Sequence, residues 1–468
     1  MEKKYLAIAD QLETQIKDGI LRAGEKMPSV RNLCREKSIS MSTAQLVYST
    51  LVGKSLIEAK SKSGYFVSGW INNKLEIPQI SSPDSGFSKN TADDLITKVF
   101  DTINNKNITQ LSLGIPSGEL IPINQLNQLM KKSVQDLTGC GTEYEQIEGN
   151  INLRRSISRW AYNSGSRFRE GDIITTNGCI NAVSYCLMAL TKPGDTIAVE
   201  SPTYFGILQL IKNLGLNILE LPTNAESGID LDVLKKHLQR DKISVCLLIS
   251  NFNNPLGSCI PDNQKKEIVD LLTYYNVPLI EDDIYGDLYF GKSRPKSCKS
   301  FDEAGNVLWC SSISKSLAPG YRVGWVAPGK FKKDIIRLKT FHSISSVSLT
   351  EQVISTFIDS GKYEIHLRKM RRVLQSNAFQ FMRVISEFFP DDIKITKPEG
   401  SMFLWLELNK KNDAVEIFNK ALKSKISIAP GRLFTSQNQF NNYMRLSYAL
   451  TWTKQLEKDL IKLSKFIK

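Results

Sequence analysis

The stretch that decides the fold is Ser312-Ile-Ser-Lys315 followed by Pro319-Gly-Tyr-Arg-Val-Gly-Trp325. It comes just after the apolar run 307–310, Val-Leu-Trp-Cys, which predicts a buried strand. A lysine after Ser-x-Ser is common by itself, but here Arg322 follows it at a spacing of seven residues. Polar groups placed just past a strand lie where open α/β sheets bind their ligands. We therefore expect Lys315 to face a ligand site.

Other short apolar runs alternate with helical patterns from about residue 91 onward, which predicts an α/β sheet covered by helices on both faces. The predicted strands are 173–176, 196–199, 218–221, 245–249, 278–280 and 307–310. Polar segments follow five of them: Asn177-Gly-Cys, Ser201-Pro-Thr-Tyr204, Asn251-Phe-Asn-Asn-Pro255, Asp282-Asp-Ile-Tyr285 and Ser311-Ser-Ile-Ser-Lys315. One such segment is typical of a solvated turn, but five at one sheet edge predict a site.

The residue types in these segments suit pyridoxal 5'-phosphate. That cofactor needs a lysine for a Schiff base and an acid for its pyridine nitrogen. It also needs donors to its phenolate oxygen, an aromatic ring for stacking, and a phosphate cup of backbone N–H groups with an arginine. Through Asn254-Pro-Leu-Gly257 and the lysine stretch, residues 110–468 resemble fold-type I aminotransferases. The resemblance implies a mostly parallel sheet between helices and a smaller α+β C-terminal subdomain.

The resemblance also implies a role for each site residue. Lys315 would be the aldimine lysine and the catalytic residue. Asp282 would pair with the pyridine nitrogen, Asn254 and Tyr285 would hold the phenolate oxygen, and Tyr204 would stack on the ring. The implied phosphate ligands are Gly178, Cys179, Ser312, Ser314 and Arg322, with Tyr144 reaching the phosphate of the partner subunit and Arg445 holding a substrate or effector carboxylate bidentately.

Each of these residues taken alone has a plainer interpretation, as a core tyrosine, a solvated acidic turn or a surface ion pair. The ordered set at family spacing favours the site. Cys179-Ile180 departs from the family pattern, which often has a serine and a glutamine there, so side-chain contacts to the phosphate are reduced. No basic residue follows Tyr204 until Lys212, which makes acidic substrates less favoured.

The first seventy residues show three short helical patterns and a basic hairpin. Apolar residues recur at helical spacing within 5–16, 30–34 and 44–52, and Ser29 is a plausible N-cap of the second helix. The runs 56–59 and 65–67 flank Lys60-Ser-Lys-Ser-Gly64, which indicates a hairpin with a basic tip. This pattern predicts a winged helix-turn-helix.

The start of the third helix and the hairpin tip suit contacts to double-stranded DNA. Small hydroxyl side chains can approach phosphates, the Gln45 amide can pair with adenine, and basic side chains supply salt-sensitive backbone contacts. The predicted DNA-contacting residues are Arg31, Ser40, Met41, Ser42, Thr43, Gln45, Lys60, Lys62 and Gly64.

This segment resembles the GntR-type winged-helix regulators through Gly24-Glu-Lys-Met-Pro-Ser-Val-Arg31, Ser40-Met-Ser-Thr43 and Ser63-Gly-Tyr-Phe-Val67. Met41 stands where that family commonly has a basic residue. The alternative is a three-helix packing module that binds no nucleic acid.

The domain organisation follows from these patterns. We predict a DNA-binding domain at 1–69 and a polar linker at 70–90, because this stretch has two prolines and no apolar period. An aminotransferase-like domain at 91–468 follows. Its large subdomain is expected at about 120–340, and its small subdomain at about 91–119 together with 341–468.

Composition sets the remaining bounds. The chain is 41% hydrophobic and 23% charged, typical of a soluble globular protein, and its net charge of +13 favours a polyanionic partner. Its longest apolar run, 245–249, is far short of a membrane span, and its N-terminus shows no export signal. Eight scattered cysteines without a C-x-x-C pair, and three histidines, argue against a metal cluster or disulfide framework. We expect a cytoplasmic protein without a metal.

A GntR-type winged helix joined to an aminotransferase-like domain is similar to the architecture of the MocR (GabR-like) regulators. The resemblance implies a bacterial, homodimeric transcription factor that binds pyridoxal phosphate. It would sense the cofactor, or an amino compound that condenses with it, through the Lys315 aldimine. Two alternatives remain: an active aminotransferase that acts on an amino acid, and a cofactor-free dimerisation scaffold, which the intact Lys315, Asp282 and Arg322 disfavour.

Overall fold

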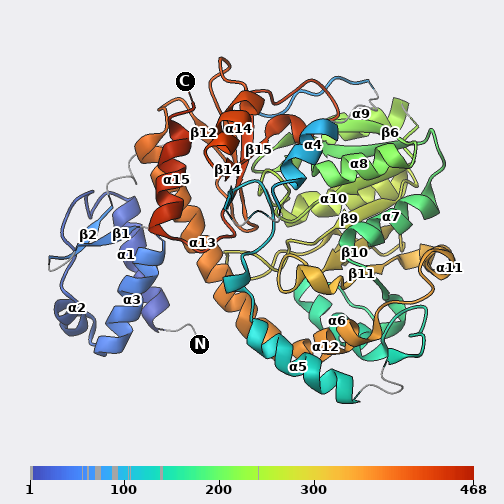
Figure 1. Ribbon diagram of the computed structural model, residues 1–468, viewed down its shortest axis with the longest axis horizontal. Coiled ribbons are helices and arrows are strands. Elements are labelled where there is room, and N and C mark those ends of the chain that lie inside the picture. The colour runs from blue at the N-terminus through green and yellow to red at the C-terminus, as the bar shows by residue number, and fades with distance from the viewer. Residues whose placement is uncertain are drawn as a thin grey trace.

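The computed structural model describes residues 4–54, 56–60, 63–68, 75–86, 93–103, 105, 107–136, 141–240 and 242–467. The described residues up to 68 form a small N-terminal unit, called the head below, and those from 75 onward form a larger unit, called the body. In Figure 1 the head, in blue, lies beside the long helix α13 (Lys362–Phe388) of the body.

The head has three helices and one hairpin. They are α1 (Lys4–Lys17), α2 (Val30–Lys37), α3 (Met41–Gly53), β1 (Ile57–Lys60) and β2 (Gly64–Val67), with β1 and β2 antiparallel. The Ser29 side chain accepts a hydrogen bond from the backbone N–H of Asn32 and so caps α2. Apolar side chains from all three helices and the hairpin form one core that is separate from the core of the body. The winged helix-turn-helix prediction is confirmed.

An eight-stranded sheet organises the body. Its order is β4-β11-β10-β9-β8-β5-β6-β7. Neighbours from β10 to β6 are parallel, whereas β11 and β7 run antiparallel to their neighbours. The strands are β4 (Ile174–Thr176), β5 (Thr196–Ser201), β6 (Asn217–Asn224), β7 (Gly228–Ile229), β8 (Val245–Leu248), β9 (Leu279–Asp282), β10 (Val307–Ser312) and β11 (Gly324–Ala327).

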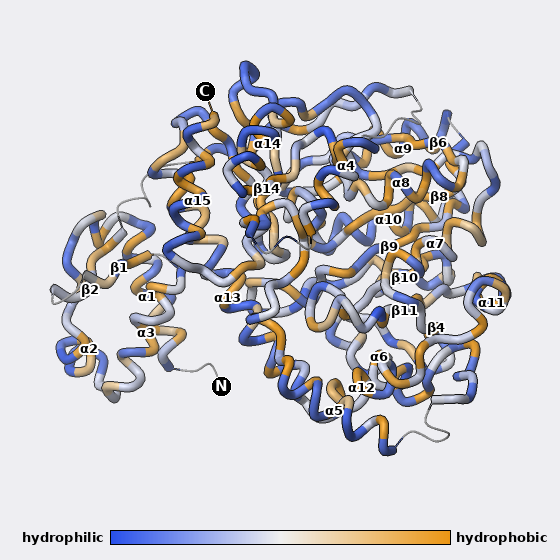
Figure 2. The backbone as a smooth tube through the Cα atoms, in the orientation of Figure 1, coloured by the Kyte–Doolittle hydropathy of each residue, from blue (hydrophilic) through white to orange (hydrophobic). Residues whose placement is uncertain are grey.

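Both faces of this sheet are covered, because its strands are apolar on both sides. On β8, Val245 and Leu247 enter one apolar cluster, and Cys246 and Leu248 enter a second cluster on the opposite face. Figure 2 shows hydrophobic residues concentrated in these strands. The α-helices of the body that precede α13 in the chain are α4 (Asp93–Phe100), α5 (Ile123–Asp136), α6 (Ile151–Ala161), α7 (Cys179–Leu190), α8 (Phe205–Asn213), α9 (Leu231–Arg240), α10 (Asp262–Tyr274), α11 (Lys332–His342) and α12 (Ser348–Asp359).

A smaller sheet completes the body. Its antiparallel order is β12-β13-β16-β15, and a short parallel pair, β3 with β14, joins residues 109–110 to residues 426–427. The elements are β3 (Thr109–Gln110), β12 (Lys394–Ile395), β13 (Phe403–Glu407), β14 (Ile426–Ser427), β15 (Ala429–Pro430), β16 (Tyr443–Ser447), α14 (Ala414–Lys423) and α15 (Lys454–Ser464). The predicted α/β architecture with a smaller C-terminal part is confirmed.

The six predicted strands all exist, but several bounds differ. β9 extends to Asp282 and β10 to Ser312, so these polar residues are the last of their strands and not the first of the loops that follow. Strand β11, which pairs antiparallel with both β10 and β4, was not predicted from the sequence. The short run 324–327 shows neither the strand nor its direction. Strand direction depends on pairing, which local sequence does not show.

The described part of the linker predicted at 70–90 is held against the body. Its residues 75–86 run along the body, where the Ser81 hydroxyl donates a hydrogen bond of 2.5 Å to the carbonyl of Ser201. The backbone N–H of Gln79 also donates to the carboxylate of Glu407 at 3.0 Å. Residues 70–74 and 87–90 lie outside the described residues. Polar composition alone does not distinguish a linker without contacts from an extended segment that hydrogen bonds hold against a domain.

Candidate functional site

Lys315 follows β10 and is half-buried at the edge of the large sheet. Its Nζ donates a hydrogen bond of 2.6 Å to the carbonyl oxygen of Gly114, which lies after β3. Burial, which penalises the ammonium form, lowers the pKa of Lys315 to about 8; Arg445 and Arg322 lower it further, and Asp282 opposes them. A lysine with such a pKa has a substantial neutral, nucleophilic fraction near neutral pH.

Asp282 ends the neighbouring strand β9. Its Oδ1 accepts hydrogen bonds from Cys179 Sγ at 3.1 Å and from the backbone N–H of Ile284 at 3.2 Å. Burial raises the pKa of the Asp282 carboxyl to about 6, although these two hydrogen bonds and Lys315 lower it. A cationic N–H group in the cavity would supply the partner that this buried carboxylate needs.

The loop between β4 and α7 forms a cradle beside Arg322. Gly178 has φ +92°, and a Cβ there would lie 2.4 Å from Arg322 Nη2. Arg322 is held in turn by a 2.7 Å hydrogen bond from Nη2 to the carbonyl of Asn177. The unpaired N–H groups of the first turn of α7 begin at Cys179, so this corner suits an anion.

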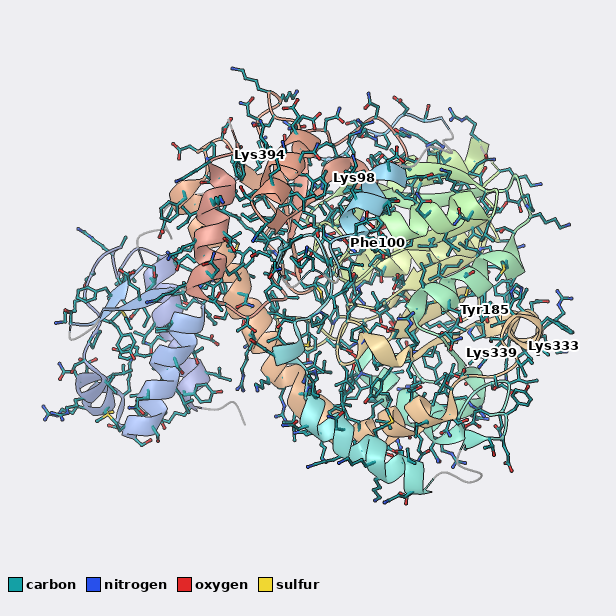
Figure 3. The ribbon with its side chains drawn as sticks, viewed as in Figure 1. Lys98, Phe100, Tyr185, Lys333, Lys339 and Lys394 are labelled. Carbon is teal, nitrogen blue, oxygen red and sulfur yellow. The ribbon has the colours of Figure 1, made fainter. Side chains whose placement is uncertain are left out.

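The base of the cradle is braced from the α11 side. Lys339 Nζ donates to the backbone carbonyl of Thr175, on β4, at 2.8 Å and to Ser346 Oγ at 2.9 Å. The Tyr185 hydroxyl, on α7, lies 3.1 Å from Ser343 Oγ. Figure 3 shows Tyr185 and Lys339 at this side of the body. These bonds hold β4 and α7, and with them the loop that contains Gly178.

A buried polar group lies on the opposite side of the cavity. Asn254 Nδ2 donates to the Tyr285 hydroxyl at 3.2 Å, and Arg445 Nη1 donates to Asn254 Oδ1 at 2.7 Å. The Arg445 guanidinium lies between two aromatic rings, 4.3 Å from the centroid of Phe403 and 4.9 Å from that of Phe434. Its Nη2 also donates to the carbonyl of Ser112.

The guanidinium of Arg445 is not fully satisfied. Within the described part of the chain its Nε is buried and has no hydrogen-bond partner. Burial lowers the pKa of Arg445 to about 10, and the nearby Tyr285 and Tyr204 raise it. A buried cation with an unused donor fits a carboxylate ligand, because the planar guanidinium can hold one bidentately.

A cavity of about 150 Å³ lies at this edge of the sheet. It is lined by Cys179, Ile180, Tyr204, Ile249, Asn254, Asp282, Ile284, Tyr285, Ser314, Lys315 and Arg322. The sequence therefore predicted most of the polar lining. It did not predict the three isoleucines of the lining, because single apolar residues form no recognisable motif. It also did not predict that the carbonyl groups of Gly114 and Ser112 accept hydrogen bonds from Lys315 and Arg445, because backbone groups are the same in every sequence.

Four predicted site residues do not line this cavity. Gly178 immediately precedes the lining residue Cys179, and Arg445 Nη1 donates to the lining residue Asn254. Ser312 is buried behind Ser314: its hydroxyl lies 2.8 Å from Ser314 Oγ and accepts a 2.9 Å hydrogen bond from the Ser314 backbone N–H. Ser314, and not Ser312, lines the cavity. Tyr144 is 80% exposed on the surface and does not line the cavity of its own chain. Its contact with a partner subunit stays a prediction.

The predicted DNA-contacting residues gather at the start of α3. Met41, Ser42 and Gln45 are exposed, whereas Ser40 Oγ caps the helix by accepting a hydrogen bond from the Thr43 N–H. The Ser40 hydroxyl also lies 2.9 Å from Ser42 Oγ and 2.8 Å from Thr43 Oγ1. These three hydroxyl groups therefore form one local cluster on the exposed end of the helix.

The remaining predicted DNA-contacting residues lie outside α3. Arg31 is exposed on α2, and Gly64, at φ +99°, begins β2. Lys62 and the side chain of Lys60 lie outside the described residues. Among the described residues there is no group of three or more histidine, cysteine or acidic side chains that could hold a metal, and no helix long and apolar enough to cross a membrane.

Comparisons with known proteins match both units. The family "Bacterial regulatory proteins, gntR family" matches residues 4–67, and the family "Aminotransferase class I and II" matches residues 106–461. The uncharacterized HTH-type transcriptional regulator YjiR of Escherichia coli (strain K12) is 36% identical over 453 residues, 96% of this chain and 95% of the relative. The uncharacterized HTH-type transcriptional regulator YdcR of the same strain is 33% identical over 99% of both chains.

Among solved structures, the body is similar to LysN, the alpha-aminoadipate aminotransferase of Thermus thermophilus. That crystal structure is complexed with N-(5'-phosphopyridoxyl)-L-leucine. The two chains share 26% identity with a TM-score of 0.73, and the match covers 80% of this chain and 94% of LysN. The predicted fold-type I aminotransferase fold is confirmed.

Proposed function

This chain belongs to the GntR-type transcriptional regulators of the MocR-like type, which carry an aminotransferase class I/II domain, and we propose that it regulates transcription in response to a ligand of the body. In this proposal the head binds double-stranded DNA, and the body senses pyridoxal phosphate or an amino compound. The supporting observation is that one cavity of the body brings Lys315, Asp282 and Arg322 together, and that the same chain carries a helix-turn-helix at its N-terminal end.

The residues of the cavity fit pyridoxal phosphate. Gly178 has no side chain and so lets Arg322 lie close to the start of α7. Within the described residues, the Asp282 carboxyl is buried without a cationic hydrogen-bond donor, and Arg445 Nε has no partner. When bound, the cofactor supplies an aldehyde that condenses with amines and a ring that withdraws electrons. Lys315 would provide the amine that holds it.

The other cavity residues would bind and orient the cofactor and the effector. Asp282 would hold a proton on the ring nitrogen, and Asn254 and Tyr285 would donate hydrogen bonds to the phenolate oxygen. Arg322 and the first turn of α7 would bind the phosphate, Tyr204 would cover one face of the ring, and Arg445 would bind the effector carboxylate.

The titration of Lys315 and Asp282 predicts how cofactor uptake depends on pH. Lys315 would bind the cofactor as the neutral amine, and the neutral fraction rises with pH until it levels off above the lowered pKa of about 8. Asp282 must be ionised to hold the ring nitrogen, and it ionises as pH rises through its raised pKa of about 6. We therefore expect uptake by the apoprotein to accelerate from pH 5 to pH 9 in two steps.

The measurement is the rate at which visible absorbance develops after apoprotein is mixed with pyridoxal phosphate. Asp282→Asn is the matched control, because it should lose the lower step and keep the upper one. A rate that stays constant between pH 6 and pH 9 would contradict the roles given to both residues.

Helix α13 connects the cavity to the head. Next to Lys315, Ser316 Oγ lies 2.7 Å from the Tyr363 hydroxyl, and the Ser316 carbonyl oxygen lies 2.7 Å from His366 Nε2. Tyr363 and His366 are in the first two turns of α13. Further along this helix, Arg372 and Gln375 line a cavity whose opposite wall is formed by α1 and α3 of the head. A change at Lys315 therefore has a packed route to the head.

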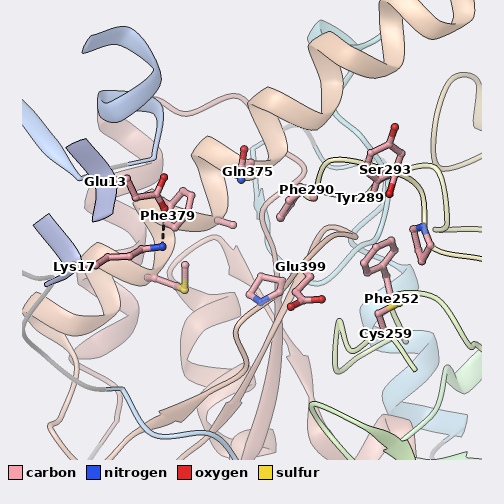
Figure 4. Close-up of a pocket in the computed structure, with 15 residues that line it drawn as sticks. Glu13, Lys17, Phe252, Cys259, Tyr289, Phe290, Ser293, Gln375, Phe379 and Glu399 are labelled. Atoms are coloured by element: carbon pink, nitrogen blue, oxygen red, sulfur yellow. Dashed lines mark ion pairs between the residues drawn. The ribbon is translucent and has the colours of Figure 1, made fainter. Parts of the chain in front are cut away.

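A second cleft shows how loosely the head and the body meet. It has a volume of about 420 Å³, and Glu13 and Lys17 of α1 face Tyr289, Phe290 and other body residues across it (Figure 4). A boundary with such voids is packed less tightly than a domain core. In this proposal the head takes different positions relative to the body in the two states of the regulator.

Near the cavity, two backbone carbonyl groups already bond to the two cations that a ligand would engage. Lys315 donates to the carbonyl of Gly114 and Arg445 to that of Ser112, two residues apart on one segment. A ligand that engages both cations would compete with these two carbonyl groups. The ligand would then bind with different free energy when these carbonyl groups are bonded to the two cations and when they are not. A regulatory ligand needs such a difference between two states.

A homodimer is part of the proposal. Phe341, Ile344 and Val347, at the end of α11 and in the loop before α12, are 84%, 49% and 58% exposed. Exposed apolar side chains close together in sequence are typical of protein interfaces. Tyr144, also highly exposed, would reach the phosphate of the partner subunit.

DNA binding tests the regulator function directly. We expect the full-length protein to bind the region upstream of its own gene with an affinity that falls steeply with salt, because phosphate contacts release counterions. Gln45→Ala should weaken this binding by about 1–3 kcal/mol, the discrimination that one bidentate base contact supplies. Gln11→Ala is the matched control, since Gln11 is on α1 and bonds to Lys37.

Footprinting and salt titrations measure both effects. Equal binding by wild type and Gln45→Ala, with no protected sequence, would contradict DNA recognition by α3. The alternative function, an aminotransferase, is tested by turnover of a panel of amino acids. A rate on the order of ten per second would favour it, because that is a typical enzyme rate.

A further inference from the structure

The thiol of Cys179 contacts the acid of the site and not the anion cradle. Cys179 is the first residue of α7, and its side chain is 3% exposed. Its Sγ donates to Asp282 Oδ1 at 3.1 Å, across 103 residues of sequence. The same Oδ1 accepts the backbone N–H of Ile284 at 3.2 Å, so both hydrogen bonds to this carboxylate fall on one oxygen.

We propose that Cys179 is a positioning residue, whose thiol holds Asp282 Oδ1 and so presents Oδ2 to the ring nitrogen of pyridoxal phosphate. This inference rests on the proposed function. One residue then serves both ends of the cofactor, because the backbone N–H of Cys179 stays in the first turn of α7, at the anion cradle. Among the described residues, Cys179 is the one side chain that donates a hydrogen bond to Asp282.

The surroundings of the thiol favour this role over chemical reactivity. Burial, followed by the charge of Asp282, raises the pKa of the Cys179 thiol well above its usual value, so it stays a protonated donor. Behind it, Cys186 Sγ and Cys310 Sγ lie 3.7 Å apart, and Cys310 is paired with Asp282 in the sheet register. Two further thiols therefore lie near the strand end that carries Asp282.

The hydrogen bond has a defined effect on the titration of Asp282. A donor to the ionised carboxylate stabilises that form and lowers its pKa, against the burial that raises it. Without the thiol, Asp282 would protonate at a higher pH and would no longer hold a proton on the ring nitrogen there. The other titratable groups that face Asp282, or act on it from packed elements, are Asp283, Lys315, Glu200, Tyr204, Tyr285 and Cys310.

The test compares Cys179→Ala and Cys179→Ser in the full-length protein. Affinity for pyridoxal phosphate is measured by absorbance titration between pH 5 and pH 8. In wild type the affinity should rise as pH increases through about 6, the pKa of Asp282. In Cys179→Ala the midpoint should move up by about one pH unit, which corresponds to one hydrogen bond to a charged group. Cys179→Ser keeps a donor and should stay close to wild type.

Cys246→Ala is the matched control for loss of a buried sulfur. Cys246 is fully buried on β8, and its thiol makes no hydrogen bond to Asp282. Its midpoint should equal that of wild type. If Cys179→Ala keeps the wild-type midpoint, the positioning role is overturned while the proposed function stands. If wild-type protein takes up no pyridoxal phosphate, the proposed function fails as well.

A second measurement does not depend on the folding of the alanine variant. The S–H stretching band of Cys179 is isolated as the infrared difference between wild-type apoprotein and Cys179→Ser. A strong hydrogen bond to the ionised carboxylate lowers this frequency, so the band should move upward as pH falls through about 6 and Asp282 becomes protonated. A band that does not change with pH would overturn the inference.

Discussion

Replacing Lys315 with alanine is expected to abolish the visible absorbance of the protein incubated with pyridoxal phosphate. Among the described residues, Lys315 is the one lysine that lines the cavity. Burial lowers the pKa of Lys315 to about 8, so this lysine offers a nucleophilic amine at the cavity. The loss should be complete, because no neighbouring lining residue carries an amine. Arg322 and the first turn of α7 stay in place, so weak non-covalent binding of the phosphate should remain.

Absorbance spectra and borohydride reduction followed by peptide mapping measure this effect. Wild type should carry the reduced adduct on the peptide that contains Lys315, and the variant should carry none. Lys333→Ala is the matched control, since Lys333 lies on α11, away from the cavity lining, and should keep the full signal. An adduct of undiminished yield in the Lys315 variant would rule out the assigned role. Folding is checked by the thermal transition, which should change little.

Replacing Arg445 with glutamine is expected to produce the second largest effect, on the response to the amino compound. Arg445 is buried between Phe403 and Phe434 and has a free Nε among the described residues. A charge-assisted hydrogen bond contributes about 1.5–3 kcal/mol, and a bidentate pair involves two. The concentration of a carboxylate-bearing amine that half-saturates the protein should therefore rise by about a hundredfold or more.

Pyridoxal phosphate should still bind this variant, because Arg322 and the first turn of α7 are unchanged. Its uptake should shift to higher pH, because Arg445 bonds to Asn254 and lowers the pKa of Lys315. Titrating spectral changes with amino acids, and with the corresponding decarboxylated amines, separates the two ligand groups. The amines should bind wild type and variant equally. Arg432→Gln, at an exposed arginine nearby in η9 (Gly431–Phe434), is the control. An unchanged titration with amino acids would show that the carboxylate binds elsewhere.

The candidate site was predictable from sequence to the extent that it depends on strand ends. Asp282, Asn254 and Lys315 stand just at or after buried strands, and the parallel arrangement brings those ends to one edge. Strand existence depends on local apolar runs, so the six predicted strands all formed. Both Ser312 and Ser314 were predicted as phosphate ligands, and the turn that follows β10 places Ser314 at the cavity, which spacing alone does not determine.

What the sequence by itself determined is the set of local elements and the chemical groups they carry. The Lys315 segment with its arginine, the capped helices at Ser29 and Ser40, and the β1–β2 hairpin all depend on neighbours within a few residues. Only the tertiary structure decided which groups meet. Cys179 bonds to Asp282 across 103 residues, Lys315 to Gly114 across 201, and Arg445 to Ser112 across 333. Such partners, and the lowered pKa of Lys315, depend on packing and burial, which no short sequence pattern specifies.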